Sequence, residues 1–336
     1  MKCRKILTAL LAAAMVTLSL AACQNDSTPP SKAPVEDSSV SSEQPEAPAG
    51  PIAIIVPAAD HGWLAGVSYF AEQKCKELGL AEGTGYKLVT SANVNEQANQ
   101  IDEMINLNVS AVVLQPHNDE VSVSAKKIVD AGIPLVVFDR KVDVDYTTFV
   151  AGDNTAMGEK SAEYIGEKLQ GKGTVAVLNV PSSGSVSSER VDGFKKVMGE
   201  KYADVQLVDI TAADFTQQEG LKTATDALVA NSHLDAVFSI DDESSLGILQ
   251  AIKDASRSEI KYLSGGGGGQ DYFKKISAET QPECFTATYS PSMIKDAIQA
   301  AKDILDGKNV AKDLIVPPDI VTNANVADYL DENSPY

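Results

Sequence analysis

Histidine and cysteine are scarce in this chain, which has three histidines and four cysteines among its 336 residues. The histidines lie far apart in the sequence, and no Cys/His spacing is typical of a zinc site. Four cysteines do not make a disulfide framework in a chain of this length, so Cys75 and Cys284 are expected to be small core residues. We therefore predict no metal site and no cofactor.

Positively charged residues are also few. The chain has 28 lysines and arginines but 47 aspartates and glutamates, which gives a formal net charge of −19. Binding to nucleic acid depends on patches of lysine and arginine that neutralise phosphates, and no such patch is present. The acidic balance instead indicates a soluble exterior with no attraction for anionic lipid. Nucleic acid is therefore excluded as a partner.

The motifs of common hydrolases are missing. No GxSxG nucleophile elbow occurs, and the serines of SSGSVSS (182–188) have no histidine and aspartate at a recognisable triad spacing. Paired carboxylates alone do not make a glycosidase. The expectation is a protein that is not an enzyme.

The first 22 residues have the pattern of a targeting signal. A basic start precedes an apolar stretch (residues 6–20) that is too short and too poorly flanked for a membrane span. The sequence Leu20-Ala21-Ala22-Cys23 resembles the lipobox of bacterial lipoproteins, which implies cleavage before Cys23 and a diacylglyceryl thioether on its sulfur. Ordinary secretion with a chance cysteine is the alternative. The prediction is a signal peptide over residues 1–22 and lipidation at Cys23.

Residues 23–50 are expected to be the lipidated cysteine and a disordered tether. Residues 24–50 contain six serines and five prolines but no leucine, isoleucine or aromatic residue. Such a segment buries too little apolar surface to offset its ordering entropy. The mature protein is thus predicted to be held at the extracytoplasmic face of the cell membrane.

From Pro51 onward, two patterns alternate. Short apolar runs are typical of strands buried on both faces, and longer stretches with helical spacing separate them. Strands are predicted at 52–56, 111–115, 134–138, 174–180 and 236–240, and helices at 64–79, 95–108 and 242–255. Such alternation indicates parallel sheets. Because roughly 285 residues exceed one comfortable core, we predict an α/β fold with two doubly wound lobes.

Polar and aromatic residues gather directly after the predicted strands. In open α/β sheets, the site lies beyond the carboxyl ends of the strands. Trp63 follows the first strand, Asp139 and Arg140 follow PLVVF, and Phe215 and Asp241 hold corresponding places in the second half. Aromatic faces can cover the C–H surface of a sugar-like ligand while charged groups bind its hydroxyls. This mixture favours a neutral polyhydroxylated ligand.

Each of these positions also has a purely structural explanation. The pair Asp139-Arg140 is alternatively a solvated strand end, and Trp63 is alternatively a core residue. Asp241 and the two acids after it are alternatively residues favoured at a helix N-terminus, and those two are expected to be structural. Arg190 is alternatively paired with a nearby acid such as Asp192 or Glu189.

The run GGGGG (265–269) follows a predicted strand and precedes a predicted helix. It lacks the dinucleotide-binding pattern, because position 270 is glutamine, and it lacks the GK[ST] of a P-loop. Its backbone N–H groups could receive a phosphate or a carboxylate. The favoured interpretation is that the missing side chains leave room for a larger ligand, or for a close contact between the backbone and a ligand hydroxyl.

The order of several segments resembles the type I periplasmic solute-binding proteins, in particular their ribose-binding subgroup. The similarity covers nearly all of residues 51–333, and its segments include IPLVVFDR, VAGDNTAMGEKSAEYI, SSERVDGF, ADFTQQEG, LDAVFSIDDESSLGILQAI and VTNANV. It implies two lobes joined by three crossing segments, with sugar bound between them. The N-terminal lobe would comprise 51–152 plus 290–317, and the C-terminal lobe 153–289 plus 318–336. The crossings would fall near Gly152-Asp153, Tyr289-Ser290 and Pro317-Pro318.

The resemblance also implies which residues bind the ligand. Asp139 and Arg140 match an Asp-Arg pair that binds sugar hydroxyls, and Arg190 in SSERVDGF matches a second sugar-binding arginine. Trp63 and Phe215 fall where aromatic residues sandwich the sugar ring.

Several positions depart from the ribose-binding pattern. His61 and Asp241 each stand where the ribose binders have an asparagine, and Gly266 stands in place of an aspartate. Tyr289 replaces a glutamine at a crossing, and Leu64 replaces a second aromatic residue. We include the first four of these residues in the predicted ligand site. Their chemistry favours a different pentose, a hexose or a sugar alcohol over ribose.

The resemblance implies a monomeric, lipid-anchored substrate-binding protein of an ABC importer, which closes on a sugar or sugar alcohol and delivers it to a membrane permease. One alternative is a binder of an anionic or modified sugar that feeds a chemosensory or signalling receptor, and a secreted carbohydrate-active enzyme is another. Transcription regulators that share the two-lobed body need an N-terminal DNA-binding module. This chain has the predicted signal and tether in that place.

Overall fold

The computed structural model describes residues 50–59 and 62–336. The predicted signal peptide, the lipidation site at Cys23 and the predicted ligand residue His61 lie outside the described residues. Within the described ranges, no helix is long and apolar enough to cross a membrane.

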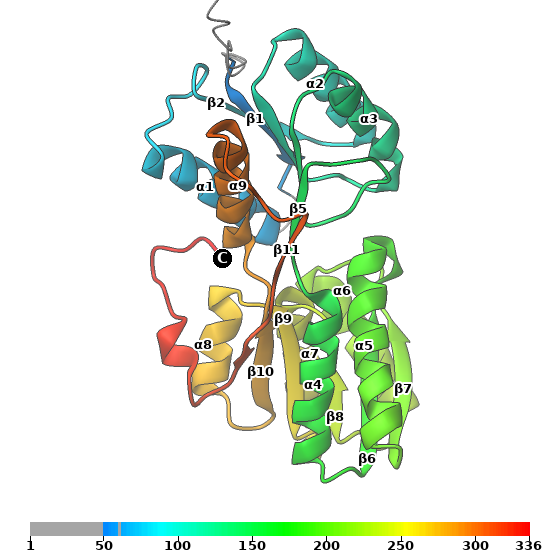
Figure 1. The fold of residues 1–336 in the computed structure, drawn as a ribbon. Helices are drawn as coiled ribbons and strands as arrows, with labels where there is room; N and C mark the ends of the chain where they lie inside the picture. Colours follow the sequence, from blue (N-terminus) through cyan, green and yellow to red (C-terminus); the bar gives the residue numbers. More distant parts are fainter. Residues whose placement is uncertain (1–49, 60–61) are drawn as a thin grey trace, which may run out of the picture. The chain divides into compact units, whose positions relative to one another are not determined.

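The described residues form two six-stranded sheets, each surrounded by helices (Figure 1). The first sheet is parallel throughout and has the order β11-β5-β4-β3-β1-β2. Its strands are β1 (Ile52–Pro57), β2 (Tyr86–Ser91), β3 (Ala111–Leu114), β4 (Leu135–Phe138), β5 (Thr148–Gly152) and β11 (Asp313–Val316). With α1 (Gly62–Glu77), α2 (Val94–Asn106), α3 (Ser122–Asp130) and α9 (Ile294–Leu305), it makes up what we call the first lobe.

The second sheet has the order β12-β10-β9-β8-β6-β7, and only its pairing of β12 with β10 is antiparallel. Its strands are β6 (Gly173–Asn179), β7 (Val205–Thr211), β8 (Ala236–Phe238), β9 (Tyr262–Gly267), β10 (Glu283–Thr288) and β12 (Ile320–Val321). With α4 (Asn154–Lys168), α5 (Ser185–Lys201), α6 (Gln217–Ala230), α7 (Asp242–Asp254) and α8 (Gln270–Ala278), it makes up the second lobe. The predicted two-lobed α/β fold is confirmed.

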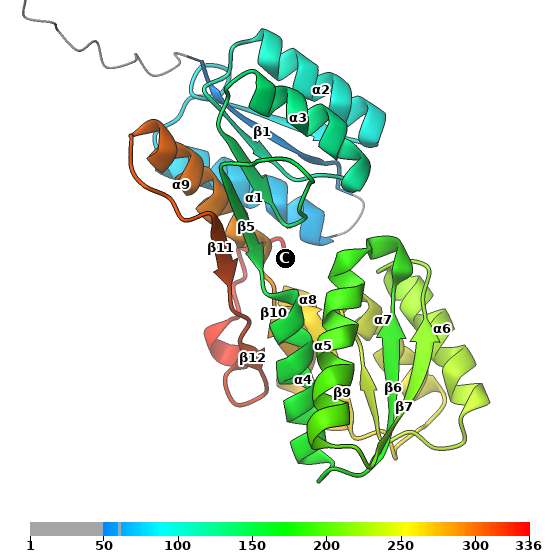
Figure 2. The same cartoon turned by 45° about the vertical axis from the view of Figure 1, so that its right-hand side comes forward.

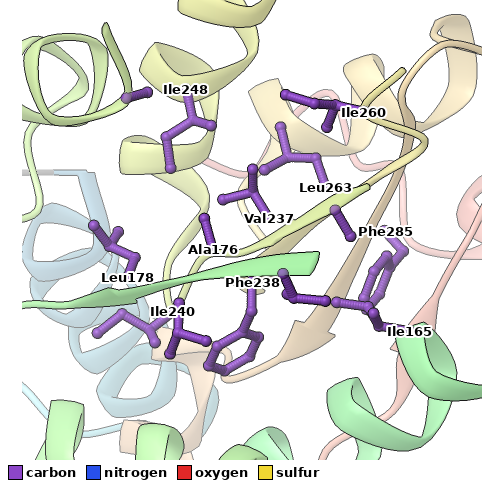
Figure 3. Close-up of a cluster of buried hydrophobic side chains, with 14 of the residues drawn as sticks. Ile165, Ala176, Leu178, Val237, Phe238, Ile240, Ile248, Ile260, Leu263 and Phe285 are labelled. Atoms are coloured by element: carbon purple, nitrogen blue, oxygen red, sulfur yellow. The ribbon is translucent and has the colours of Figure 1, made fainter. Parts of the chain in front are cut away.

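Burial on both faces explains why the strands read as continuous apolar runs. All six residues of β1 are buried, and the first five alternate between two cores. Ile52, Ile54 and Val56 pack with α1 and α9, whereas Ala53 and Ile55 pack with α2 and α3 on the opposite face of the sheet (Figure 2). The second lobe has its own core, in which Phe238 and Phe285 lie among aliphatic side chains of the sheet and helices (Figure 3).

Within the described residues, the chain passes between the sheets three times. It crosses after β5 into α4, after β10 into the 3-10 helix Pro291–Met293 that precedes α9, and after β11 into β12. These are the places where the resemblance predicted crossings. As a result, the carboxyl ends of strands from both sheets can contribute to one site.

The two cysteines of the described region are free and buried, as predicted. Cys75 lies in a core of the first lobe and Cys284 in the core of the second. Burial raises the pKa of each thiol to about 12, so neither forms a reactive thiolate at neutral pH.

The second-lobe core yields a stability prediction. Phe238 is 2% exposed, and its ring stacks on that of Phe194 with centroids 4.0 Å apart. Phe238→Ala should therefore lower the free energy of unfolding of the second lobe by about 3–5 kcal/mol, measured by urea denaturation. Val229→Ala in α6 is the control, because Val229 is 85% exposed and its loss should change that free energy by less than about 0.5 kcal/mol. Equal losses of stability from the two substitutions would contradict the assignment of Phe238 to the core of the second lobe.

Candidate functional site

A cavity of about 70 Å³ is lined by residues that follow strands of both sheets. Every described residue of the predicted ligand site lines it: Trp63, Asp139, Arg140, Arg190, Phe215, Asp241, Gly266 and Tyr289. The other lining residues are Leu64, Gln115, Val186, Glu243, Gly267 and Tyr336. The structure therefore brings together residues that are far apart in the chain, such as Trp63 and Tyr289, which are 226 positions apart.

Asp139 follows β4 and is held by donors on two sides. Its Oδ1 accepts a hydrogen bond from the hydroxyl of Tyr289 at 2.7 Å, and its Oδ2 accepts one from Nε2 of Gln115 at 3.1 Å. Its backbone has a φ of +69°, in the left-handed region that costs a residue with a Cβ about 1–2 kcal/mol. The strained backbone and both donors fix the carboxylate, which is 7% exposed, at the cavity wall. The alternative of a solvated strand end therefore does not hold for Asp139, whereas the Arg140 side chain is 32% exposed.

The two arginines reach the cavity from different lobes. Arg140 donates from Nη1 to the backbone oxygen of His117 at 2.6 Å. Arg190 on α5 donates from Nε to Asn154 at 2.8 Å and from Nη1 to the backbone oxygen of Ile240 at 2.7 Å. The Arg190 guanidinium lies 4.7 Å from the ring centroid of Tyr289. Arg190 is 5% exposed, so it faces inward instead of pairing with the acids of its own helix.

Tyr289 occupies the crossing between the lobes and organises the aromatic side of the cavity. Its ring lies 5.8 Å from that of Trp63, whose indole N–H donates to the Tyr289 backbone oxygen at 2.8 Å. The Trp63 ring also stacks on Phe138, with centroids 6.2 Å apart and an angle of 5°. Burial and the nearby Asp139 carboxylate raise the pKa of Tyr289 well above its usual range. Its hydroxyl is therefore a neutral donor to Asp139.

Asp241 caps the N-terminus of α7 and leaves one oxygen open. Its Oδ1 accepts a hydrogen bond from the backbone N–H of Ser244 at 2.8 Å, whereas its Oδ2 is buried without a hydrogen-bond partner. Burial raises the pKa of Asp241 to about 7, and the Asp242 carboxylate adds to the rise, while the Ser244 bonds and Arg190 oppose it. Asp241 therefore has the predicted helix-cap role and also faces the cavity.

Asp242 binds the backbone N–H groups of the glycine run. Its Oδ2 accepts hydrogen bonds from the backbone N–H groups of Gly268 at 2.6 Å and Gly269 at 2.7 Å, and its Oδ1 accepts one from Thr286 at 2.6 Å. These amide groups therefore hold a carboxylate of the protein itself, which argues against a phosphate cradle. Asp242 is structural, as expected.

Glu243 also has a structural contact, and it joins the two lobes. Its Oε1 accepts a hydrogen bond from the backbone N–H of Gly62, the first residue of α1, at 2.8 Å. A carboxylate is favoured at that helix end, because the N-terminal N–H groups and the helix dipole attract negative charge. Glu243 thus ties the second lobe to the first at the edge of the cavity.

Three buried polar atoms at the cavity have no hydrogen-bond partner. Five side-chain atoms of the described residues are in this state, and Oε1 of Gln115, Nε of Arg140 and Oδ2 of Asp241 all belong to cavity-lining residues. The Gln115 amide is oriented by its bond to Asp139, because a carboxylate must accept from the NH₂ group. The nearest carboxylate oxygen to Nε of Arg140 is 3.7 Å away. Because buried polar atoms are rarely left unpaired, these two acceptors and one donor indicate a ligand with complementary groups.

Several lining residues were not predicted from the sequence. Gln115 directly follows β3, so the strand-end rule that selected Asp139 would also have selected it. Val186 and Gly267 carry no polar side chain to mark them. Tyr336 lies beyond β12, the last strand, and no local pattern signals its position in the cavity.

Comparisons with known proteins agree on one kind of protein. Residues 52–309 match the periplasmic binding protein domain. The ribose import binding protein of Bacillus subtilis (strain 168) is 32% identical over 227 residues, which are 66% of this chain and 72% of that protein.

Solved structures give the same result. The binding protein of an arabinose ABC transporter from Shewanella sp. ANA-3, bound to L-arabinofuranose, matches with a TM-score of 0.74 and 25% identity, over 83% of this chain and 94% of that one. A solute binding protein of an ABC transporter from Bacillus halodurans C-125, with bound myo-inositol, matches in fold with a TM-score of 0.76 and 19% identity. The match covers 87% of this chain and 100% of that one.

The open carboxylate of Asp241 predicts a pH dependence of stability. Because its folded-state pKa of about 7 lies above the unfolded value of 3.8, the folded protein holds the extra proton between these pH values. Its contribution to stability is therefore present below about pH 4 and is lost as the pH rises toward 7. Asp241→Asn retains the cap and removes this loss. The stability difference, mutant minus wild type, should thus grow between pH 4 and 7 in urea denaturation, and parallel pH profiles would contradict it.

Proposed function

This chain belongs to the type I periplasmic binding proteins, in their ribose-binding-like group, and from that premise we propose that its cavity binds a neutral sugar or sugar alcohol. The observation that carries the proposal is the set of three unpaired atoms: two acceptors and one donor. A hydroxyl can both donate and accept, so neighbouring hydroxyls of one polyol can satisfy all three. The family consists of binding proteins, which fits stoichiometric binding without turnover.

The charges of the site favour a neutral ligand over an anionic one. The backbone amides of the glycine run, which could have received a phosphate, are occupied by Asp242. Arg190 donates to groups of the protein, Glu243 lines the cavity with a carboxylate, and Asp241, with a pKa of about 7, adds negative charge in its ionised fraction. An anionic sugar would meet these carboxylates, so we do not favour a sugar phosphate.

The ligands of the similar proteins support a neutral sugar or sugar alcohol but do not identify which one binds. They are ribose, arabinofuranose and myo-inositol, all neutral and polyhydroxylated, according to the names of those proteins and structures. In this chain, the Tyr289 hydroxyl takes up one oxygen of Asp139, and Asp241 supplies an acceptor from α7. The cavity should therefore bind ligand hydroxyls at other positions than the ribose-binding proteins do. A sugar other than ribose, or a sugar alcohol, is the better candidate.

Binding would draw the two lobes together. Gln115 and Arg140 present their unpaired atoms from the first lobe, and Asp241 presents its oxygen from the second. A ligand that pairs with all three must bridge the lobes, while Trp63 and Phe215 cover its apolar surface from the two sides. Lobe closure of this kind excludes water and strengthens each hydrogen bond.

We further propose that the closed protein delivers its ligand to an ABC permease while anchored by lipid on Cys23. The predicted lipobox supports the anchor, and the Ser/Pro-rich residues 24–50 support a tether that lets the lobes reach a membrane partner. We also propose that the protein is a monomer whose N-terminal lobe comprises residues 51–152 plus 290–317 and whose C-terminal lobe comprises residues 153–289 plus 318–336.

Ligand binding can be tested with the protein's own fluorophore, because Trp63 is the one tryptophan of the chain and lines the cavity. A panel of pentoses, hexoses, polyols and sugar phosphates should give a saturable change with a neutral sugar or polyol. The same ligand should raise the melting temperature, since it binds the folded state. Responses confined to sugar phosphates would contradict the proposal.

Asp139→Asn tests the hydrogen-bond network with that ligand. The asparagine tolerates the left-handed backbone but loses the charge that orients Tyr289 and Gln115, so binding should weaken by about 2–3 kcal/mol, or roughly 30- to 150-fold. Asp119→Asn is the matched control, because Asp119 comes after β3, as Asp139 comes after β4, but is exposed and does not line the cavity. An unchanged affinity of Asp139→Asn, measured by calorimetry, would remove Asp139 from the site.

A further inference from the structure

Residues 329–336 form a segment that leads Tyr336 to the cavity and contacts both lobes. On the second lobe, Gln270 accepts a hydrogen bond from the backbone N–H of Asp331 at 2.8 Å and donates one to the backbone oxygen of Tyr329 at 3.1 Å. On the first lobe, the hydroxyl of Tyr69 on α1 donates to the backbone oxygen of Asn333 at 3.3 Å. This segment is drawn in red in Figure 1. The anchors on both sides place Tyr336 where the lobes meet.

The ring of Tyr336 fits a slot made of glycines from both lobes. A Cβ added to Gly267 would lie 2.2 Å from the Tyr336 hydroxyl oxygen, and one added to Gly269 would lie 3.4 Å from Cε2 of its ring. On α1, a Cβ added to Gly62 would lie 3.3 Å from the ring, and one added to Gly66 would lie 3.2 Å from Cβ of Tyr336. The glycine run therefore leaves room for a side chain of the protein, and not only for a ligand.

The remaining space in the cavity is small. A volume of about 70 Å³ holds only a few water-sized groups, because a single water needs at least about 10–15 Å³ of such space. That is enough for a short polyol, whereas a six-carbon sugar has many more atoms to accommodate. Because Tyr336 is part of the cavity wall, its ring takes space that a longer ligand would need.

We propose that Tyr336 is a specificity-determining residue whose ring, seated on the glycine run, limits the length of the ligand that the cleft accepts. This inference rests on the proposed function, and it goes further by naming the residue that sets ligand size. Burial and the carboxylates of Asp242, Asp241 and Glu243 raise the pKa of Tyr336 well above its usual range. The ring therefore presents a neutral hydroxyl beside the ligand.

The test uses one chemical series of increasing length: glycerol, erythritol, xylitol and sorbitol, with the matching aldoses. Affinities are measured by calorimetry for wild type and for three variants of the full chain. Tyr336→Ala should raise the affinity for the longest ligands relative to the shortest by at least tenfold, and Tyr336→Trp should lower that ratio. Tyr336→Phe should retain the wild-type ratio, because it keeps the ring. Leu330→Ala is the control on the same segment, since Leu330 is 43% exposed and does not line the cavity.

The outcomes separate this proposal from the proposed function. If wild type binds members of the series and Tyr336→Ala leaves the ratio unchanged, or alters all affinities by one common factor, the size limit is wrong while the binding function stands. If wild type binds none of these polyols or aldoses, the proposed function fails and this proposal fails with it. A melting temperature within the wild-type range shows that each variant is folded.

Discussion

The arrangement of the site depends on the hydrogen bond between the Tyr289 hydroxyl and the Asp139 carboxylate. Tyr289 lies at a crossing segment, and its backbone oxygen accepts from Trp63 of the first lobe while its ring supports Arg190 of the second. Asp139 in turn orients Gln115, which lines the cavity and whose Oε1 is buried without a hydrogen-bond partner. One buried tyrosine thus connects an aromatic wall, a carboxylate and an arginine. Loss of this bond would leave Oδ1 of the buried Asp139 carboxylate without a donor, which costs more than a typical hydrogen bond contributes.

The two adjacent buried carboxylates have different roles, because Asp242 stabilises the structure whereas Asp241 is available to a ligand. Asp242 receives hydrogen bonds from Gly268, Gly269 and Thr286, and so fixes the glycine run on which Tyr336 lies. The adjacent Asp241 receives a single helix-cap hydrogen bond and keeps one oxygen unpaired. Burial next to a like charge explains why the pKa of Asp241 rises to about 7. A hydroxyl donor from a ligand would stabilise its charged form, so ligand binding and the ionisation of Asp241 are expected to be linked.

Much of the fold followed from the sequence because its signals are local. The buried strand at 52–56 and the helix at 242–255 were each predicted to within two residues of β1 and α7 at either end, since apolar runs and cap residues lie within those segments. Asp139 and Arg190 could be proposed because strand ends and motifs mark them. Tyr336 could not, because its position depends on contacts with Tyr69 and Gln270, far away in the chain. Asp242 was expected to be structural, but its hydrogen bonds from Gly268 and Gly269 were equally hidden, since they depend on backbone N–H directions that no residue pattern reveals.

The most direct test of the account is a crystal structure of the chain with the best ligand of the panel. The account predicts ligand hydroxyls within hydrogen-bond distance of Oε1 of Gln115, Nε of Arg140 and Oδ2 of Asp241, the three atoms that lack partners in the cavity. The ligand would then bridge the two lobes, with the Trp63 and Phe215 rings against its apolar surface. A ligand that leaves these three atoms unpaired, or one held by the backbone amides of Gly268 and Gly269, would contradict it.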